Sequence, residues 1–164
     1  MEEFDRKKLI EKFSEQTGLL ISEILGKEVN LKSIDLVVTP PKIKGYVSFL
    51  NFIEDINGTI ICNFDEKSAI NIASAMNGID IEKIENPDEM DELIEASLSE
   101  IVNMIGGKAM TDFDEFGIKC NITPPTILKG DNLKLFEKSS FIYILNYFYE
   151  DNEILIMIVL KKNK

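Results

Sequence analysis

The stretch from residue 45 to residue 64 contains the clearest structural signal in the chain and reads GYVSFLNFIEDINGTIICNF. Two runs of β-branched and aromatic residues, 45–53 and 58–64, are typical of β-strands. Asn57-Gly58 lies between these runs, and an Asn-Gly pair in this position predicts a hairpin with a two-residue turn. We therefore expect a β-sheet built outward from this hairpin.

Helices are predicted on both sides of the hairpin. Before it, apolar residues recur at helical spacing over about residues 5–25, and Gly26 gives a stop signal. After it, Asp65 is a candidate N-cap for a short helix that ends at Asn77-Gly78. The inner face of this short helix is expected to contain Ile70, Ala73 and Met76.

A second long helix is predicted from Pro87 to about Phe113. Asn86 is a candidate N-cap, and the proline at the first helical position suits a helix start. The apolar stripe expected to face the sheet consists of Leu93, Ile94, Leu98, Ile101, Val102 and Ile105. Further strand-like segments are residues 34–38, 117–123, 140–149 and 153–160.

Three short matches indicate an internal repeat. Gly26-Lys27 matches Gly107-Lys108 at an offset of 81 residues. Thr39-Pro40-Pro41 matches Thr123-Pro124-Pro125 at 84, and Leu50-Asn51-Phe52 resembles Leu145-Asn146-Tyr147 at 95. The order of the three matches is preserved, and loop insertions explain the growing offset.

The repeat predicts the fold class. Each half, about residues 5–78 and 88–162, has a long helix followed by three strands, with the short helix added to the first. Half a sheet cannot bury its own apolar face, so the halves should pair. We therefore expect residues 1–164 to form one α+β domain with pseudo-twofold symmetry, in which long helices cover a mostly antiparallel sheet in two layers.

Composition excludes several classes of function. The 164 residues contain 18 basic and 29 acidic side chains, a net charge of −11, so nucleic acid is not an expected partner. The absence of histidine excludes Ser-His-Asp and Cys-His catalysis and the commonest zinc ligand. Cys62 and Cys120 lie in apolar, strand-like stretches and are expected to be buried, reduced thiols.

Hydropathy predicts a cytoplasmic protein without membrane insertion. The longest apolar run, Ile154 to Leu160, is a third of the roughly 20 residues that a spanning helix needs. The first residues, Met1 to Asp5, lack the basic head of a signal peptide.

The second long helix also has a polar face. Ala96, Glu100, Asn103 and Gly107 follow one another at helical spacing on a face other than the apolar stripe. Glu100 and Asn103 therefore project side by side, and the small residues Ala96 and Gly107 leave the backbone around them open to close approach. On spacing alone the favoured interpretation of this pair is a solvated helix face. For Gly106-Gly107 it is tight packing against a neighbour or the start of helix termination.

These residues resemble a known signature. Residues 100–107, EIVNMIGG, followed by Ile122-Thr123-Pro124-Pro125-Thr126, resemble the motif of the CheC/CheX/FliY family of chemotaxis phosphatases. That motif is a Glu, two residues, an Asn and a later Pro, usually with Asp or Ser four positions before the Glu. This chain has Ala96 there. At the 81-residue offset Leu19 and Ser22 stand opposite Glu100 and Asn103, so the single motif resembles the CheX branch.

The resemblance implies a function for each residue. It implies a homodimer joined through its sheet that dephosphorylates a CheY-like response regulator, with Mg²⁺ held by the regulator and no cofactor or metal of its own. Asn103 would orient the attacking water and Glu100 would pair with a regulator lysine. Ala96, Gly107 and Pro125 would contact the partner.

One alternative function remains open at this point, and a second is disfavoured. The same fold occurs in the middle domain of the flagellar switch protein FliM, which implies a non-catalytic binding or scaffold module, and Ala96 favours that alternative. The acidic residues Asp88, Glu89, Asp91, Glu92 and Glu95 suggest a cation site, but acids in the first turns of a helix complement its dipole and are expected to form a solvated face.

Overall fold

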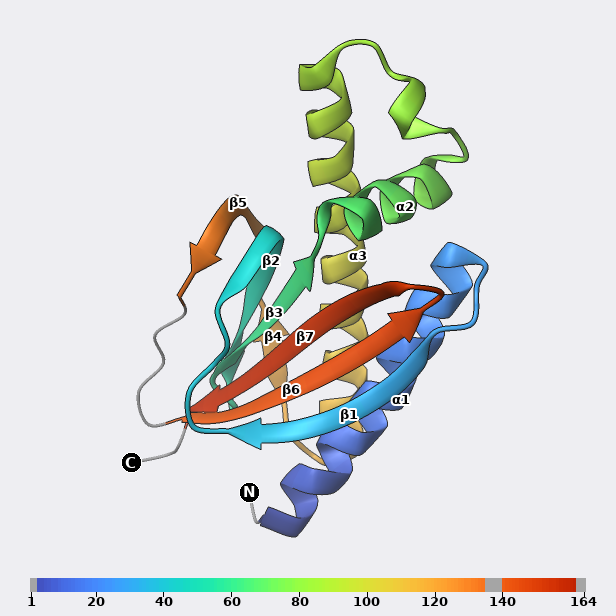
Figure 1. Cartoon of the computed structure of the whole chain (residues 1–164). Helices are drawn as coiled ribbons and strands as arrows, with labels where there is room; N and C mark the ends of the chain where they lie inside the picture. Colours follow the sequence, from blue (N-terminus) through green and yellow to red (C-terminus); the bar gives the residue numbers. More distant parts are fainter. Residues whose placement is uncertain (1–2, 135–139, 162–164) are drawn as a thin grey trace.

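A computed structural model describes residues 3–134 and 140–161 (Figure 1). Within these ranges the chain forms three α-helices, a short 3-10 helix and seven strands. The helices are α1 (Glu3–Leu25), α2 (Glu66–Asn77), η1 (Ile81–Lys83) and α3 (Pro87–Glu115). The strands are β1 (Asn30–Val37), β2 (Ile43–Glu54), β3 (Gly58–Phe64), β4 (Cys120–Ile122), β5 (Thr126–Leu133), β6 (Ser140–Tyr149) and β7 (Asn152–Lys161).

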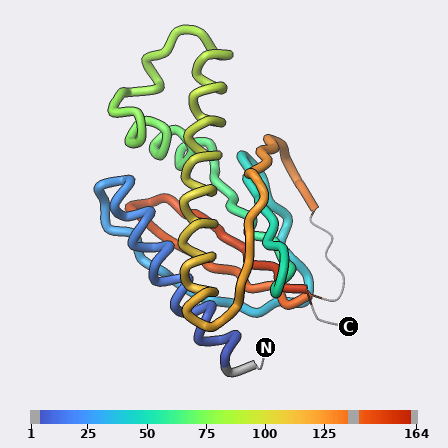
Figure 2. Tube along the Cα trace, turned by 180° about the vertical axis from the view of Figure 1, so that it is seen from behind, coloured from blue at the N-terminus to red at the C-terminus, as the bar shows by residue number. Residues whose placement is uncertain are grey.

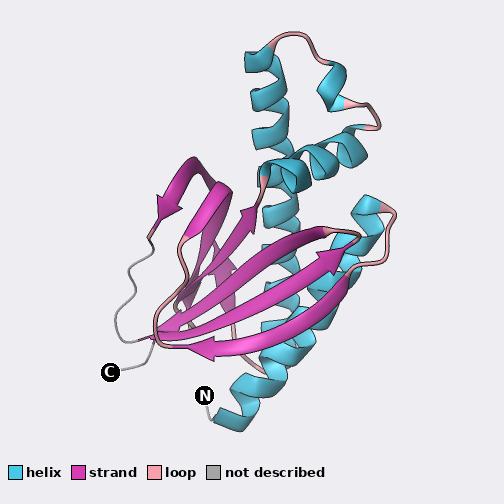
Figure 3. Cartoon of the chain, viewed as in Figure 1, coloured by secondary structure: helices cyan, strands magenta, loops and turns pink. Residues whose placement is uncertain are grey.

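The strands form one antiparallel sheet, and the long helices α1 and α3 lie side by side across one of its faces (Figure 2). The strand order is β1-β6-β7-β3-β2, and both β4 and β5 pair with the outer side of β2. Figure 3 shows the resulting separation of helices from strands. The predicted α+β class is confirmed.

The pairing register relates the two halves by an approximate twofold axis between β3 and β7, where Ile61 lies opposite Met157. Leu50 lies opposite Ile60 in one hairpin, and Leu145 lies opposite Ile156 in the other. Leu50-Asn51-Phe52 and Leu145-Asn146-Tyr147 therefore occupy equivalent places, as their sequence match predicts.

The two Thr-Pro-Pro segments, residues 39–41 and 123–125, do not occupy equivalent places in the fold. Ile122 lies opposite Phe52, and Leu31 lies opposite the equivalent residue Tyr147. The segment 123–125 after Ile122 thus corresponds to residues 32–34 inside β1, whereas residues 39–41 connect β1 to β2. The prolines divide the second half's first strand into β4 and β5, which is why that half has four strands rather than the predicted three.

Two further strand predictions are corrected. The hairpin loop is not a two-residue turn, since β2 ends at Glu54 and Gly58 already pairs with Phe52 and Leu160. Gly58 is required instead by close backbone approach, because a Cβ there would lie 2.2 Å from the Val159 carbonyl oxygen. β1 begins at Asn30 rather than Ile34.

The helix signals are confirmed in detail. The Asp65 side chain accepts a hydrogen bond from the Ser68 backbone N–H at 2.7 Å, and the Asn86 side chain accepts one from Asp88 at 3.0 Å. Gly26 and Gly78 follow α1 and α2 in the left-handed conformation, with φ of 62° and 63°. In α3 the fully buried stripe residues are Ile94, Leu98, Ile101, Val102 and Ile105.

The buried face of the short helix agrees with the expected one only in part. Its fully buried apolar residues are Ala69, Ile72 and Ala73, while Ile70 and Met76 are half-buried at the margin of the core. The helix packs on α3 and α1 as well as on the sheet, so it is covered from more than one side.

The sheet is apolar on both faces. The face under the helices forms the main core, and the opposite face carries a second cluster of buried side chains: Ile43, Val47, Ile61, Ile142, Ile144, Met157 and Val159. Cys62 and Cys120 are both buried free thiols, as predicted, and burial raises the pKa of each above its ordinary value.

Candidate functional site

The polar face of α3 presents Glu100 and Asn103 to solvent. Both side chains are exposed, as is Ala96 one turn before Glu100. Neither makes a hydrogen bond or ion pair with another described residue, whereas Ser97 on the neighbouring face is buried and donates to the Leu93 carbonyl at 2.7 Å. The carboxylate and the amide are therefore free to meet a partner molecule.

Gly106 brings this part of α3 close to the sheet. A Cβ on Gly106 would lie 2.6 Å from Leu50 Cδ2 and 3.0 Å from Ile122 Cδ1. Gly107 has nothing within 4 Å of the equivalent position and is exposed. The helix continues to Glu115, so the pair of glycines permits tight packing and does not end the helix.

The segment Thr123-Pro124-Pro125, here called the proline wall, lines the same groove as Glu100 and Asn103 of α3. Asn51 of β2 fixes it in place with two hydrogen bonds of 3.0 Å. The Asn51 N–H donates to Thr123 Oγ1, and the Asn51 carbonyl accepts from the Thr123 N–H. Since proline has no N–H, the wall leaves the sheet ladder here and turns toward the helix.

Helix and wall enclose an open groove of about 440 Å³, here called the α3 groove. It is lined by Ala96, Ser99, Glu100, Asn103, Ile122, Thr123, Pro124 and Pro125. Four of the five predicted site residues thus come together, and the fifth, Gly107, is exposed on the same helix but does not line the groove.

Ser99 is the groove residue that the sequence analysis missed. It precedes Glu100 and lies one turn before Asn103. The sequence analysis considered only the residues that follow one another from Ala96 to Gly107 at helical spacing. Including the residues directly next to Glu100 and Asn103 would have identified Ser99.

A polar cluster holds β5 against the first turns of α3. The Tyr46 hydroxyl donates to Asp91 Oδ1 at 3.0 Å and accepts from Lys129 Nζ at 2.9 Å, and Lys129 lies 3.5 Å from Asp91. Burial raises the pKa of Tyr46, and the hydrogen bond to Tyr46 raises the pKa of Lys129. Asp91 therefore links α3 to β2 and β5. Within the described residues no group of three His, Cys, Asp or Glu side chains could hold a metal ion.

The first half has a corresponding groove between α1 and β1. From the helix it is lined by Glu11, Ser14, Glu15, Gly18 and Leu19. No asparagine or glutamine of α1 lines it among the described residues, and the Ser22 hydroxyl donates instead to the Lys27 carbonyl. The helix wall of this groove therefore lacks the amide that Asn103 supplies in the second half.

The fold is that of the CheC-like proteins, and comparison with known proteins specifies the family. A family model described as Chemotaxis phosphatase CheX matches residues 46–148. CheY-P phosphatase CheX from Thermotoga maritima is 32% identical over 89 residues, which are 54% of each chain. The alignment thus spans about half the length of that relative.

Solved structures agree over almost the whole chain. The CheX-CheY-BeF3-Mg²⁺ complex from Borrelia burgdorferi matches with a TM-score of 0.82 and 26% identity, covering 93% of this chain and 97% of that one. A chemotaxis protein CheX from Desulfovibrio desulfuricans matches with a TM-score of 0.81 and 18% identity, covering 94% and 99%. The chain belongs to the CheX family.

None of the described helices is both long and apolar enough to cross a membrane.

Proposed function

We propose that this protein hydrolyses the aspartyl-phosphate of a CheY-like response regulator, with α3 inserted beside the phosphorylated site. The observation that carries the proposal is the pairing of Glu100 and Asn103, exposed and without a partner among the described residues, on one wall of the α3 groove. An acid and an amide one turn apart can act together on a single bound partner.

Asn103 is the residue that we assign to catalysis. Phosphoryl transfer depends mainly on positioning and electrostatics, and a glutamine amide orients the attacking water in GTPases. The amide of Asn103 has a donor and an acceptor, so it can hold a water in line with the phosphorus. This role needs no histidine, and the chain has none.

Glu100 is assigned to binding. Its carboxylate would pair with a lysine of the regulator and fix the position of α3. Ala96 and Pro125 line the same groove and would contact the regulator, while Gly107 leaves an open stretch of helix backbone for its approach. Ser99 adds a hydroxyl to this contact surface.

The relatives support the partner and the reaction. The Thermotoga relative is a CheY-P phosphatase, and the Borrelia structure contains CheY and Mg²⁺ together with CheX. We infer that Mg²⁺ belongs to the regulator and that this chain supplies no cofactor. Acting on a response regulator, the protein would work in the cytoplasm, and as a homodimer it would present two α3 grooves.

Phosphate release tests the proposal directly. A CheY-like regulator phosphorylated with acetyl phosphate should lose its phosphate faster when catalytic amounts of this protein are added. Binding of the phosphorylated regulator without faster release would contradict the proposal and favour the scaffold alternative.

A further inference from the structure

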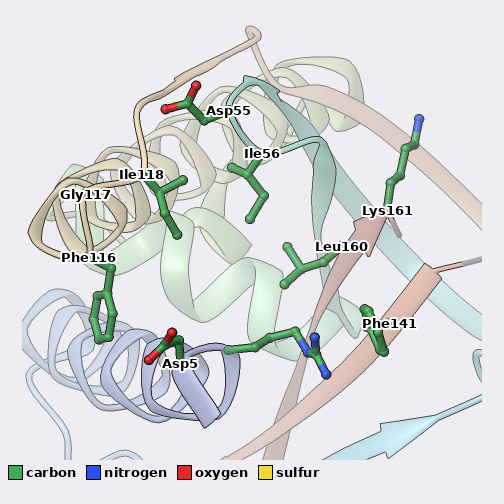
Figure 4. A pocket seen from close by; sticks show the side chains of 10 residues that line it. Asp5, Asp55, Ile56, Phe116, Gly117, Ile118, Phe141, Leu160 and Lys161 are labelled. Atoms are coloured by element: carbon green, nitrogen blue, oxygen red, sulfur yellow. The ribbon is translucent and has the colours of Figure 1, made fainter. Parts of the chain in front are cut away.

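A second cavity, lined by other residues, lies away from the α3 groove. It has a volume of about 690 Å³ and lies between the start of α1, the segment after α3, the start of β6 and the end of β7 (Figure 4). Apolar side chains from four segments surround it: Ile56, Phe116, Ile118, Phe141 and Leu160. Phe116 and Asn103 are 13 residues apart on or next to α3, a rise of roughly 20 Å, so this cavity is separate from the α3 groove.

A buried arginine lines this cavity. Arg6 is only 8% exposed, its guanidinium carbon lies 3.7 Å from the centre of the Phe141 ring, and its Nε donates to the Tyr143 hydroxyl at 2.9 Å. Within the described residues no carboxylate forms an ion pair with Arg6, and its terminal Nη groups have no acceptor. Arg6 lines the cavity and has no counter-ion among the described residues, so an anion that entered the cavity could form a charge-assisted pair with it.

We propose that this cavity binds a small organic monocarboxylate with an apolar body. The free Nη groups of Arg6 form a planar fork that matches the two oxygens of a carboxylate. The ring of apolar side chains would enclose the rest of the ligand, as in most small-molecule sites.

The charges at the cavity favour a monoanion over a phosphate. Asp5 and Asp55 also line it, and the only other cation on its wall among the described residues is Lys161. The Asp55 carboxylate is already engaged, since it accepts a hydrogen bond from the Lys119 N–H at 3.0 Å. Asp5 is exposed and would repel a dianion more strongly than a singly charged ligand.

The test uses the full chain and does not involve a response regulator, so it is independent of the phosphatase proposal. The probe is 3-phenylpropionate, titrated calorimetrically, with its uncharged amide and inorganic phosphate as comparisons. The chain has no tryptophan, so Phe116→Trp at the cavity rim provides a single fluorescent reporter of where the probe binds. We expect saturable binding of the carboxylate at about 10 μM to 1 mM, a matching fluorescence change, and at least tenfold weaker binding of amide and phosphate.

Two variants complete the test. Arg6→Gln should weaken carboxylate binding at least tenfold, because the charge and the fork are lost. Asp5→Asn on the adjacent position keeps Arg6 and should tighten binding severalfold, which keeps the test decisive if Arg6→Gln does not fold. Absence of carboxylate binding to the wild type, equal binding of amide or phosphate, or no effect of Asp5→Asn would overturn the proposal.

Discussion

At the scale of single residues, the two adjacent glycines of α3 should respond oppositely to alanine. Gly107→Ala should stabilise the protein by roughly 0.5–1 kcal/mol, because it gains helix propensity and meets no neighbour within 4 Å. Gly106→Ala gains the same propensity but places a methyl group against the buried Leu50 and the half-buried Ile122, and overpacking of this kind costs about 1–3 kcal/mol. Urea unfolding of both variants measures the difference. Equal stabilisation by the two would show that the helix does not depend on close approach at Gly106.

Glu100 should govern affinity for the regulator. Glu100→Lys replaces the proposed partner of a regulator lysine with a like charge, so binding of the phosphorylated regulator should weaken at least tenfold at low salt. The effect should diminish as ionic strength rises. Glu95→Lys makes the same charge change on an exposed position of α3 outside the groove and is the matched control. If titration gives both variants the same affinity, the assigned ion pair is wrong.

At the scale of elements, a buried acid weakens the contact between α1 and α3. Asp112 is 3% exposed, its Oδ2 has no hydrogen-bond partner, and Lys12 of α1 lies 3.9 Å away and also pairs with Glu115. Burial raises the pKa of Asp112, which the Lys12 charge only partly offsets. The native state therefore binds the Asp112 proton more readily than the unfolded chain.

The raised pKa of Asp112 determines how its ionisation affects the stability of the protein. Because the folded pKa is raised, the buried charge destabilises the protein at neutral pH, and the penalty disappears as pH falls through the folded pKa. Asp112→Asn should thus stabilise at neutral pH by about 1 kcal/mol, with a smaller gain near pH 4. The exposed Asp114→Asn serves as control in urea unfolding at both values. A gain that is independent of pH would contradict a buried charged Asp112.

The elements differ in how far the sequence could predict them. Helix caps and apolar stripes depend on residues close together in the sequence. The sequence therefore predicts α3 and its start at Asn86-Pro87. β5 was not predicted, because most of its side chains are exposed and its pairing with β2 depends on distant residues. The predicted two-residue turn at Asn57-Gly58 was wrong for the same reason. Gly58 is a glycine because the Val159 carbonyl of another strand lies too close for a side chain.

At the scale of the whole molecule, the sequence predicted only part of the candidate site. Glu100 and Asn103 share one helix, so periodicity alone places them together. The proline wall reaches them only through β2 and Asn51, and nothing in local spacing indicates that contact. The family resemblance supplied Pro125. Nothing in the sequence around Arg6 indicated a binding site, because its cavity forms only where α1, the segment after α3 and the strands meet.

The protein should also form a homodimer through a sheet edge. β1 is an outer strand and leaves Leu36 56% exposed, and Val38 just after it is 94% exposed. Edge strands with exposed apolar residues pair readily with a second copy. Sedimentation should give a dimer at micromolar concentration, and Leu36→Lys should shift it toward monomer. Leu128→Lys on β5 makes the same change at the opposite edge of the sheet and therefore tests which edge forms the dimer. A wild-type monomer throughout this range would contradict the prediction.

The most direct test of the proposed activity is the rate at which Asn103 variants dephosphorylate a bound regulator. With the phosphorylated regulator saturated by the protein, Asn103→Ala should release phosphate roughly a hundredfold more slowly than the wild type or worse, the usual effect of losing one transition-state contact. Its affinity for the regulator should stay near that of the wild type, and Asn103→Gln should recover part of the rate because the amide is only displaced. Undiminished phosphate release by Asn103→Ala would contradict the assignment of catalysis to Asn103.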